Sequence, residues 1–141
     1  MILYLDTSAL VPLLVEEPSS RICGELWDAA DSVTSVRLTY IEAAAALAMA
    51  ERMGRISAED EAAGRAILDE LWTSVDVVEV DHDLLTAAAR VARTHALRGY
   101  DATHCAAGIA IDDPEVVAAS RDGRLLAAWR AAGLAVHDTN R

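Results

Sequence analysis

The chain has 141 residues, 53% of them hydrophobic, and a formal net charge of −11. This length and apolar content fit one folded domain and exclude an intrinsically disordered chain. The acidity excludes a protein that holds nucleic acid by its overall charge, so any contact with nucleic acid has to depend on bound cations and local groups of arginine.

The predicted elements alternate between strands and helices. In chain order they are a strand (2–5), a helix from residue 9, a helix from 18–20 through 27, a strand (32–36), a helix (40–53), a helix from 57 through 72, a strand (75–80), a helix (81–97), a helix (101–111), a strand (116–119), a helix through residues 125–129 and a strand (134–136). This order predicts one α/β domain with a mainly parallel sheet, because parallel strands need helical crossovers.

Residues that favour helix N-termini support several of these boundaries. Thr7 and Ser8 are expected to cap the first helix, and Thr39 to cap the alanine-rich one. Ser57 precedes Asp60 with the spacing of a capping box, and Asp81 is expected to cap the helix that follows it.

Targeting and redox features are few. Charged residues interrupt every apolar run before the roughly 18 residues that a membrane span requires. The N-terminus lacks the basic start and cleavage site of a signal peptide. Cys23 and Cys105 have neither metal-type spacing nor a disulfide framework. We therefore expect a cytoplasmic protein with no membrane contact and with both thiols reduced.

Four acidic residues are placed where a parallel sheet collects functional groups. Asp6 directly follows the first strand, Asp122 follows the fourth, Glu42 lies in the first turn of the helix after the second strand, and Asp101 opens a helix. Four carboxylates at one rim repel each other unless a cation binds. Oxygen ligands without His or Cys favour Mg²⁺ or Mn²⁺, which indicates metal-assisted hydrolysis. Taken singly, Asp6 or Asp101 could be no more than a helix cap.

The segments that carry these acids resemble the PIN-domain nucleases, especially the VapC-type toxins of bacterial toxin–antitoxin pairs. The similar segments span the chain in order: LDTSAL (5–10), LTYIEA (38–43), LRGYDATHCA (97–106) and SRDGRL (120–125), the last with Ser where Thr is common. No single motif is specific, but four acids in this order and context are.

The resemblance implies a fold and a site. The fold would be a five-stranded, mainly parallel sheet in a three-layer α/β/α sandwich that spans residues 1–141. The activity would be an endoribonuclease dependent on Mg²⁺ or Mn²⁺, with Asp6 and Asp101 as the main metal ligands. Glu42 and Asp122 would complete the catalytic and metal site directly or through water. Thr7 or Ser8 could place a hydroxyl near the metal, although capping is expected of both.

The resemblance also implies partners: an RNA substrate, a second copy in a homodimer, and a small inhibitory antitoxin in a type II toxin–antitoxin system. The antitoxin groove could be formed by early apolar side chains, which could equally pack in the core: Leu13, Leu14, Ile22, Leu26 and Trp27.

Other candidate residues have plainer interpretations. His104 and Cys105 adjoin Asp101, but no second His or Cys has ligand spacing, so we expect both to pack in the core. Arg98 could meet a phosphate at the rim or remain a solvated surface side chain. Trp27, Trp72 and Trp129 are expected in apolar contacts, because they are not spaced as a base-stacking platform.

The sequence lacks residues that several other α/β protein classes require. The chain contains no Lys, which excludes aspartate-nucleophile phosphatases, receiver domains and P-loop nucleotidases, and it contains no Gly-x-Gly for dinucleotide binding. Two alternatives remain open: a non-catalytic acidic module that binds a basic partner, and a metal-dependent nuclease that acts on DNA.

Overall fold

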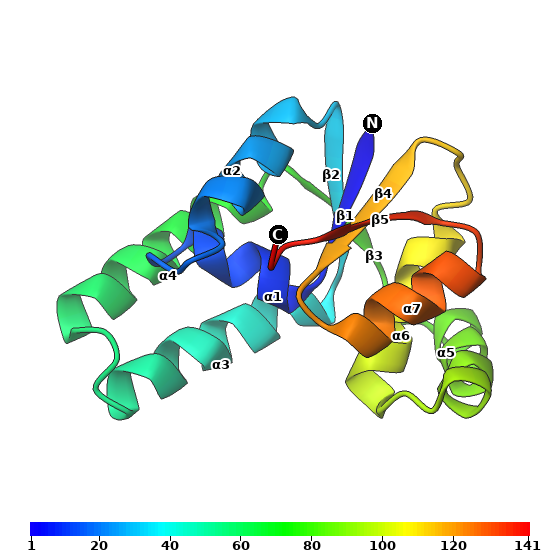
Figure 1. The fold of residues 1–141 in the computed structure, drawn as a ribbon. Helices are drawn as coiled ribbons and strands as arrows, with labels where there is room; N and C mark the ends of the chain where they lie inside the picture. Colours follow the sequence, from blue (N-terminus) through cyan, green and yellow to red (C-terminus); the bar gives the residue numbers. More distant parts are fainter.

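The computed structural model describes all residues, Met1–Arg141. Five strands form one sheet in the order β3-β2-β1-β4-β5, and every neighbouring pair is parallel. The strands are β1 (Ile2–Leu5), β2 (Ser32–Val36), β3 (Val75–Val78), β4 (Val116–Ser120) and β5 (Ala135–Asp138). The sheet predicted from the sequence is therefore confirmed, with β1 at its centre (Figure 1).

Seven α-helices and one short 3₁₀ helix connect the strands. They are α1 (Thr7–Leu10), η1 (Val11–Leu13), α2 (Ser20–Ala29), α3 (Leu38–Arg52), α4 (Ala58–Trp72), α5 (His82–His95), α6 (Gly99–Ala110) and α7 (Gly123–Ala131). None of these helices is both long and apolar enough to cross a lipid bilayer.

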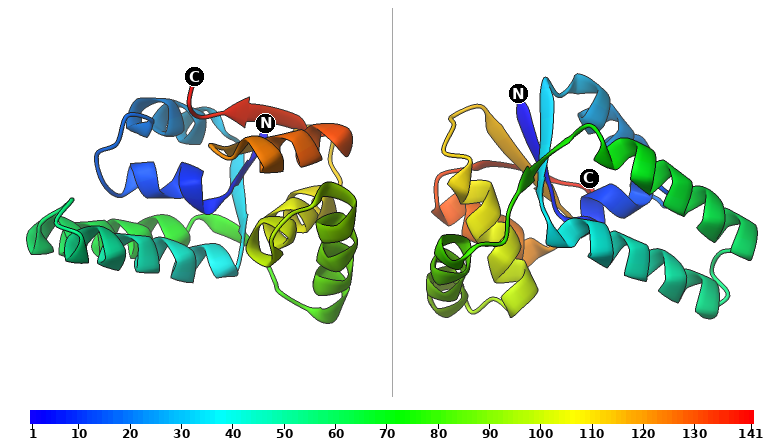
Figure 2. Two further views of the ribbon diagram at one scale, coloured as in Figure 1. Left: turned by 60° about the horizontal axis from the view of Figure 1, so that its bottom comes forward. Right: turned by 180° about the vertical axis from the view of Figure 1, so that it is seen from behind.

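The sheet lies between two helical layers, as the two views in Figure 2 show. Successive side chains of a strand point to opposite faces, and β1 illustrates this alternation. Tyr4 joins the apolar cluster formed with α5, α6 and α7, whereas Leu3 and Leu5 join the cluster formed with α1, α2, α3 and α4. All three are at most 1% exposed, so β1 is covered on both faces. The predicted three-layer sandwich is confirmed.

Two predicted caps are wrong. The first helix begins at Thr7, and Asp6 caps it by accepting a hydrogen bond from the Ala9 N–H at 3.1 Å. Thr39 lies inside α3, which begins at Leu38 without a side-chain cap. Its hydroxyl instead forms a 2.7 Å hydrogen bond with the Ser35 hydroxyl and is fully buried. A contact with Ser35 in β2, four residues earlier, therefore uses the hydroxyl that was expected to cap the helix.

Other boundaries agree with the sequence. Ser57 accepts from the Asp60 N–H at 3.0 Å, and Asp81 accepts from the Leu84 N–H at 2.8 Å, so both predicted caps are confirmed. Strand β3 ends at Val78, two residues earlier than predicted. Its partner β2 ends at Val36, which pairs with Val78, so no neighbouring strand is available beyond that point.

Candidate active site

All four predicted acids line one cavity of about 770 Å³. It lies at the carboxyl ends of the parallel strands, because Asp6 follows β1 and Asp122 lies just beyond β4. Glu42 reaches it from α3, where it stands one turn later than predicted, and Asp101 reaches it from the first turn of α6. Four segments far apart in sequence thus contribute carboxylates to a single cavity, as predicted.

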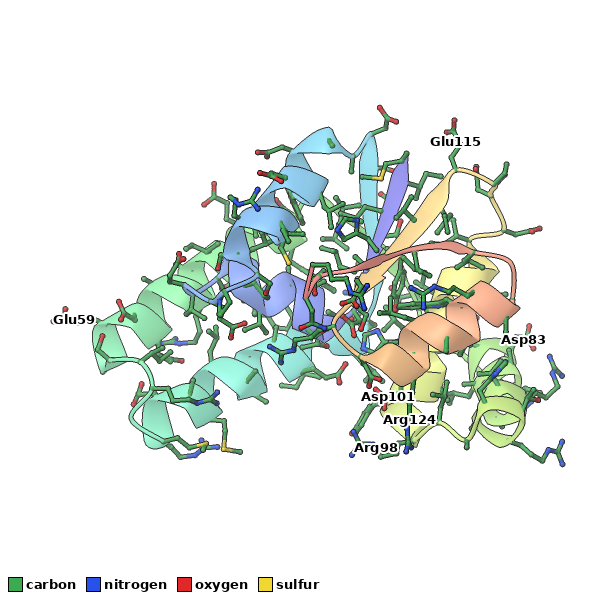
Figure 3. All side chains as sticks on the ribbon, viewed as in Figure 1. Glu59, Asp83, Arg98, Asp101, Glu115 and Arg124 are labelled. Carbon is green, nitrogen blue, oxygen red and sulfur yellow. The ribbon has the colours of Figure 1, made fainter.

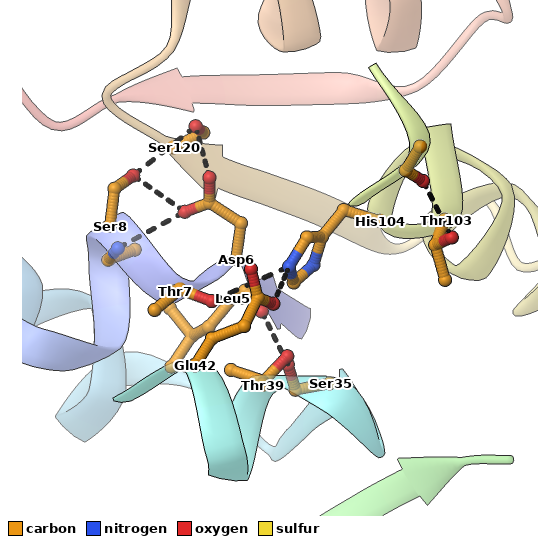
Figure 4. Close-up of polar contacts among 12 residues, drawn as sticks. Leu5, Asp6, Thr7, Ser8, Ser35, Thr39, Glu42, Thr103, His104 and Ser120 are labelled. Atoms are coloured by element: carbon orange, nitrogen blue, oxygen red, sulfur yellow. Dashed lines mark hydrogen bonds and ion pairs between the residues drawn. The ribbon is translucent and has the colours of Figure 1, made fainter. Parts of the chain in front are cut away.

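Asp6 is the most deeply buried of these acids, at 6% exposure. Its Oδ1 accepts hydrogen bonds from the Ser8 hydroxyl at 2.7 Å and from the Ala9 N–H, and its Oδ2 accepts one from the Ser120 hydroxyl at 2.6 Å (Figure 4). Burial raises the pKa of Asp6 above its ordinary value, and this effect outweighs the opposing effects of nearby His104 and of the hydrogen-bond donors. Ser8 therefore supports the carboxylate directly.

Glu42 is held by two donors on one oxygen. Its Oε1 accepts from the Thr7 hydroxyl at 3.0 Å and contacts His104 Nε2 at 2.8 Å (Figure 4). Burial is the largest influence on the Glu42 pKa and would raise it, but His104 and Thr7 together leave the pKa below its ordinary value. The ionised form of Glu42 is therefore the favoured one.

His104 is a site residue that the sequence interpretation missed. It is 3% exposed and so lies in the interior, but it also lines the acidic cavity. Its Nδ1 contacts the Tyr4 hydroxyl at 2.8 Å. Because an ionised Glu42 only accepts, Nε2 has to carry the proton, and in the neutral ring Nδ1 then accepts from Tyr4. The available signal was spacing: Asp101 and His104 are three residues apart and share a helix face.

Asp122 and Ser120 connect the fourth strand to Asp6. Asp122 caps α7, with its Oδ1 accepting from the Arg124 N–H at 2.9 Å and from the Leu125 N–H at 3.4 Å. The Ser120 hydroxyl, which donates to Asp6, accepts from the Asp122 N–H at 2.9 Å. The turn after β4 is thereby fixed against the end of β1.

The acids retain oxygen atoms for a ligand. Glu42 Oε2 and Asp122 Oδ2 accept no hydrogen bond within the protein, and Asp6 Oδ2 accepts only one. The nearest basic group to Asp101 is the Arg98 Nε, 3.6 Å from Oδ2, which is too long for a hydrogen bond.

The carboxylate oxygens of the four acids are ligands of the kind that a hard divalent cation such as Mg²⁺ prefers. No three His, Cys, Asp or Glu side chains stand so that they could hold one ion between them. Mg²⁺ does not require such a cage, because it keeps several waters and binds through one or two carboxylates.

The five apolar side chains proposed for an antitoxin groove do not line this cavity. Leu14 is buried in the core, and Leu13, Leu26 and Trp27 pack against the same cluster. The apolar part of the cavity wall is formed by other residues, including Val11, Val15, Leu47 and Ile56. The alternative interpretation of core packing is therefore confirmed for Leu14, whereas Leu13, Leu26 and Trp27 contact the core and stay partly exposed.

Comparison with known proteins places the chain among characterised relatives. The family model of the PIN domain matches residues 3–128. Ribonuclease VapC49 of Mycobacterium tuberculosis (strain ATCC 25618 / H37Rv) is 38% identical over 135 residues, which cover 96% of this chain and 94% of the relative. Ribonuclease VapC45 of strain CDC 1551 / Oshkosh matches to the same extent.

Solved structures share the fold. FitAcB from Neisseria gonorrhoeae has a TM-score of 0.73 at 19% identity, covering 100% of this chain and 99% of that one. VapC20 of Mycobacterium tuberculosis, described as a sarcin–ricin loop cleaving toxin, has a TM-score of 0.67 at 23% identity, covering 94% and 95%. The family match extends over most of the chain, and the chain belongs to the PIN-domain family.

Proposed function

We propose that this protein is a divalent-metal-dependent endoribonuclease that acts as the toxin of a type II toxin–antitoxin system. The observation that carries the proposal is the meeting of Asp6, Glu42, Asp101 and Asp122 in one cavity of a PIN-domain chain. The 38% identical relatives named ribonucleases support RNA as the substrate class.

The four acids would divide the work of metal binding. Asp6 and Asp101 would be the main ligands of Mg²⁺ or Mn²⁺, and Glu42 and Asp122 would complete the site directly or through water. Such an ion lowers the pKa of a bound water and neutralises phosphate charge. The Ser8 and Ser120 hydroxyls fix the Asp6 carboxylate. Since Thr7 and His104 engage only Oε1 of Glu42, its Oε2 is left for the metal or its water.

The protein would have an antitoxin as its inhibitory partner, form a homodimer and act in the cytoplasm as one domain over residues 1–141. Support for the antitoxin comes from structural neighbours described as a toxin–antitoxin complex from Klebsiella pneumoniae and as VapBC-1 from nontypeable Haemophilus influenzae, with TM-scores of 0.64 and 0.65.

Cleavage of RNA by the purified chain tests the catalytic proposal. The wild type is expected to cut RNA with Mg²⁺ or Mn²⁺ and to stop in EDTA. Asp6→Asn and Asp101→Asn are expected to lower the rate by roughly 100-fold or more, because each removes a negatively charged metal ligand. Asp28→Asn on α2 is the matched control: its side chain is exposed, lines no part of the cavity, and its loss leaves the rate unchanged.

Two outcomes would contradict the proposal. Undiminished RNA cleavage in EDTA would refute metal dependence. If single-stranded DNA of the same base sequence were cleaved faster than RNA, DNA would be the preferred substrate.

Growth measurements test the toxin role. Expression of the wild type without an antitoxin should slow bacterial growth, and expression of Asp101→Asn to the same level should not.

A further inference from the structure

A second cavity of about 590 Å³ adjoins the acidic centre. Asp101 and Asp122 line both cavities, so these two carboxylates stand on the boundary between them. The rest of the second cavity is formed by the segment before α6 and by the first turn of α7: Ala96, Leu97, Arg98, Gly123 and Arg124. A strand that crosses the acidic centre from the first cavity can therefore continue directly into the second.

The second cavity carries two arginines beside the shared acids. Arg98 lies three residues before Asp101, and its side chain is 90% exposed with no closer acidic partner than the 3.6 Å contact to Asp101. Arg124 lies two residues after Asp122, is exposed and forms no ion pair. Figure 3 shows Arg98, Arg124 and Asp101 gathered at the same edge of the molecule. Both guanidinium groups are therefore available to a ligand.

The two sides of the acidic centre differ in charge. Besides the four site acids, the first cavity has two arginines and two further acids, Glu16 and Glu17, and Arg121 approaches Glu17 at 4.0 Å. The second cavity has two arginines and no acid other than the shared pair. In a chain of net charge −11, acids thus outnumber arginines in the first cavity, whereas the second cavity has as many arginines as acids.

We propose that Arg98 and Arg124 bind a backbone phosphate of the RNA strand, next to the phosphate that is cleaved at the acidic centre. This inference rests on the proposed nuclease function and adds the direction in which the strand leaves the site. A guanidinium donates two parallel hydrogen bonds to phosphate oxygens, and its charge offsets the repulsion between RNA and the acidic protein. These arginines position the substrate and are not catalytic residues.

The test compares two double variants with the same change in net charge. Arg98→Ala/Arg124→Ala removes the proposed phosphate contacts. Arg21→Ala/Arg90→Ala is the control, because both of its arginines are exposed, lie on α2 and α5, and line neither cavity. Binding of a short fluorescein-labelled single-stranded oligoribonucleotide of mixed sequence is measured by anisotropy with Mg²⁺ over a range of salt concentrations. All proteins carry Asp6→Asn, so that cleavage of the probe is slow compared with the binding measurement.

Loss of the Arg98 and Arg124 contacts is expected to raise the Kd at least about tenfold, because hydrogen bonds to charged groups are strong. The magnitude of the slope of log(1/Kd) against log salt concentration should fall by about 0.7, the contribution of one phosphate of a single strand. In proteins with Asp6 intact, the KM for RNA cleavage should rise similarly while kcat stays within about twofold, since the contact exists before and during the reaction. The control pair should change none of these quantities.

Three results would overturn the inference: a Kd unchanged by Arg98→Ala/Arg124→Ala, an equal loss in the control pair, or a fall in kcat with KM unchanged. Failure of the nuclease proposal is separately visible. If the wild type leaves RNA intact with Mg²⁺ and Mn²⁺ but binding still depends on Arg98 and Arg124, the phosphate contact stands without catalysis. If Arg98→Ala/Arg124→Ala cleaves RNA with the same KM and kcat as the wild type, the nuclease proposal stands and the phosphate contact is refuted.

Discussion

His104 links the acidic centre to the interior of the protein. Its ring lies between the Tyr4 hydroxyl and Glu42, at 2.8 Å from each. Tyr4 is fully buried, and burial raises its pKa well above the ordinary value. The phenol therefore keeps its proton and can donate a hydrogen bond to His104 Nδ1. In the neutral imidazole this arrangement places the proton on Nε2, where it orients the Glu42 carboxylate.

Replacing His104 tests this positioning role. His104→Leu removes the donor, and the affinity for Mn²⁺, measured by calorimetry without RNA, should fall by about tenfold to a hundredfold. The rate kcat should fall with it, while the KM for RNA stays constant. His104→Gln restores an N–H near the position of Nε2 and should recover most of the affinity. Equal Mn²⁺ affinity in the wild type and His104→Leu would show that His104 only fills space.

The contact between α6 and α7 shows how two helices bring their acids together. Gly108 on α6 faces Trp129 on α7, and a Cβ at this position would lie 2.7 Å from the indole nitrogen. That nitrogen donates to the Cys105 carbonyl at 3.2 Å, and Trp129 is fully buried. Since Asp101 lies in the first turn of α6 and Asp122 caps α7, this contact contributes to the relative placement of the two acids.

Gly108→Ala should therefore destabilise the protein by about 1–2 kcal/mol, with overpacking exceeding the gain in helix propensity. Gly24→Ala on α2 is the matched control. Nothing lies within 4 Å of a Cβ added there, so the gain in helix propensity should stabilise the protein by about 0.5–1 kcal/mol. Urea denaturation measures both. A stability of Gly108→Ala equal to or above that of the wild type would contradict the described packing.

At the scale of the whole molecule, the two apolar clusters shield both cysteine thiols from solvent. Cys23 and Cys105 are both fully buried, one in each of the two apolar clusters. Burial raises the pKa of Cys105 to about 11, from an ordinary value of 9.0. A raised pKa in the folded state stabilises the protein below pH 9, and this contribution disappears as the pH rises toward 11.

Both thiols should consequently be unreactive in the native protein at pH 8 and should react with a disulfide reagent only on unfolding. The rate at which each cysteine reacts with the reagent then reports how often its apolar cluster opens. Stability measured between pH 9 and 11 should decline less in Cys105→Ala than in the wild type, because the variant has no thiol to ionise there. Rapid native-state labelling of Cys105 at pH 8 would contradict its placement in the core.

Much of the fold could be predicted from the sequence, because its signals are local. The strand at 32–36 was predicted with its observed bounds, and the caps at Ser57 and Asp81 were identified because capping joins residues three positions apart. The failure at Thr39 has a partly non-local cause. Its hydroxyl bonds to Ser35, only four residues away, but the Ser35 hydroxyl donates to the Leu5 carbonyl at 2.6 Å, 30 residues away in the sequence.

The sequence alone determined the order of strands and helices and hence the sheet edge to which the four acids belong. Only the tertiary structure decided which atoms meet there. The hydrogen bond between Thr7 and Glu42 joins residues 35 positions apart, and the one between Ser120 and Asp6 joins residues 114 apart. Periodicity and capping report interactions within a few residues. The role of His104, the free oxygens of the acids and the arginine-lined second cavity follow from packing across the sheet, which local patterns do not encode.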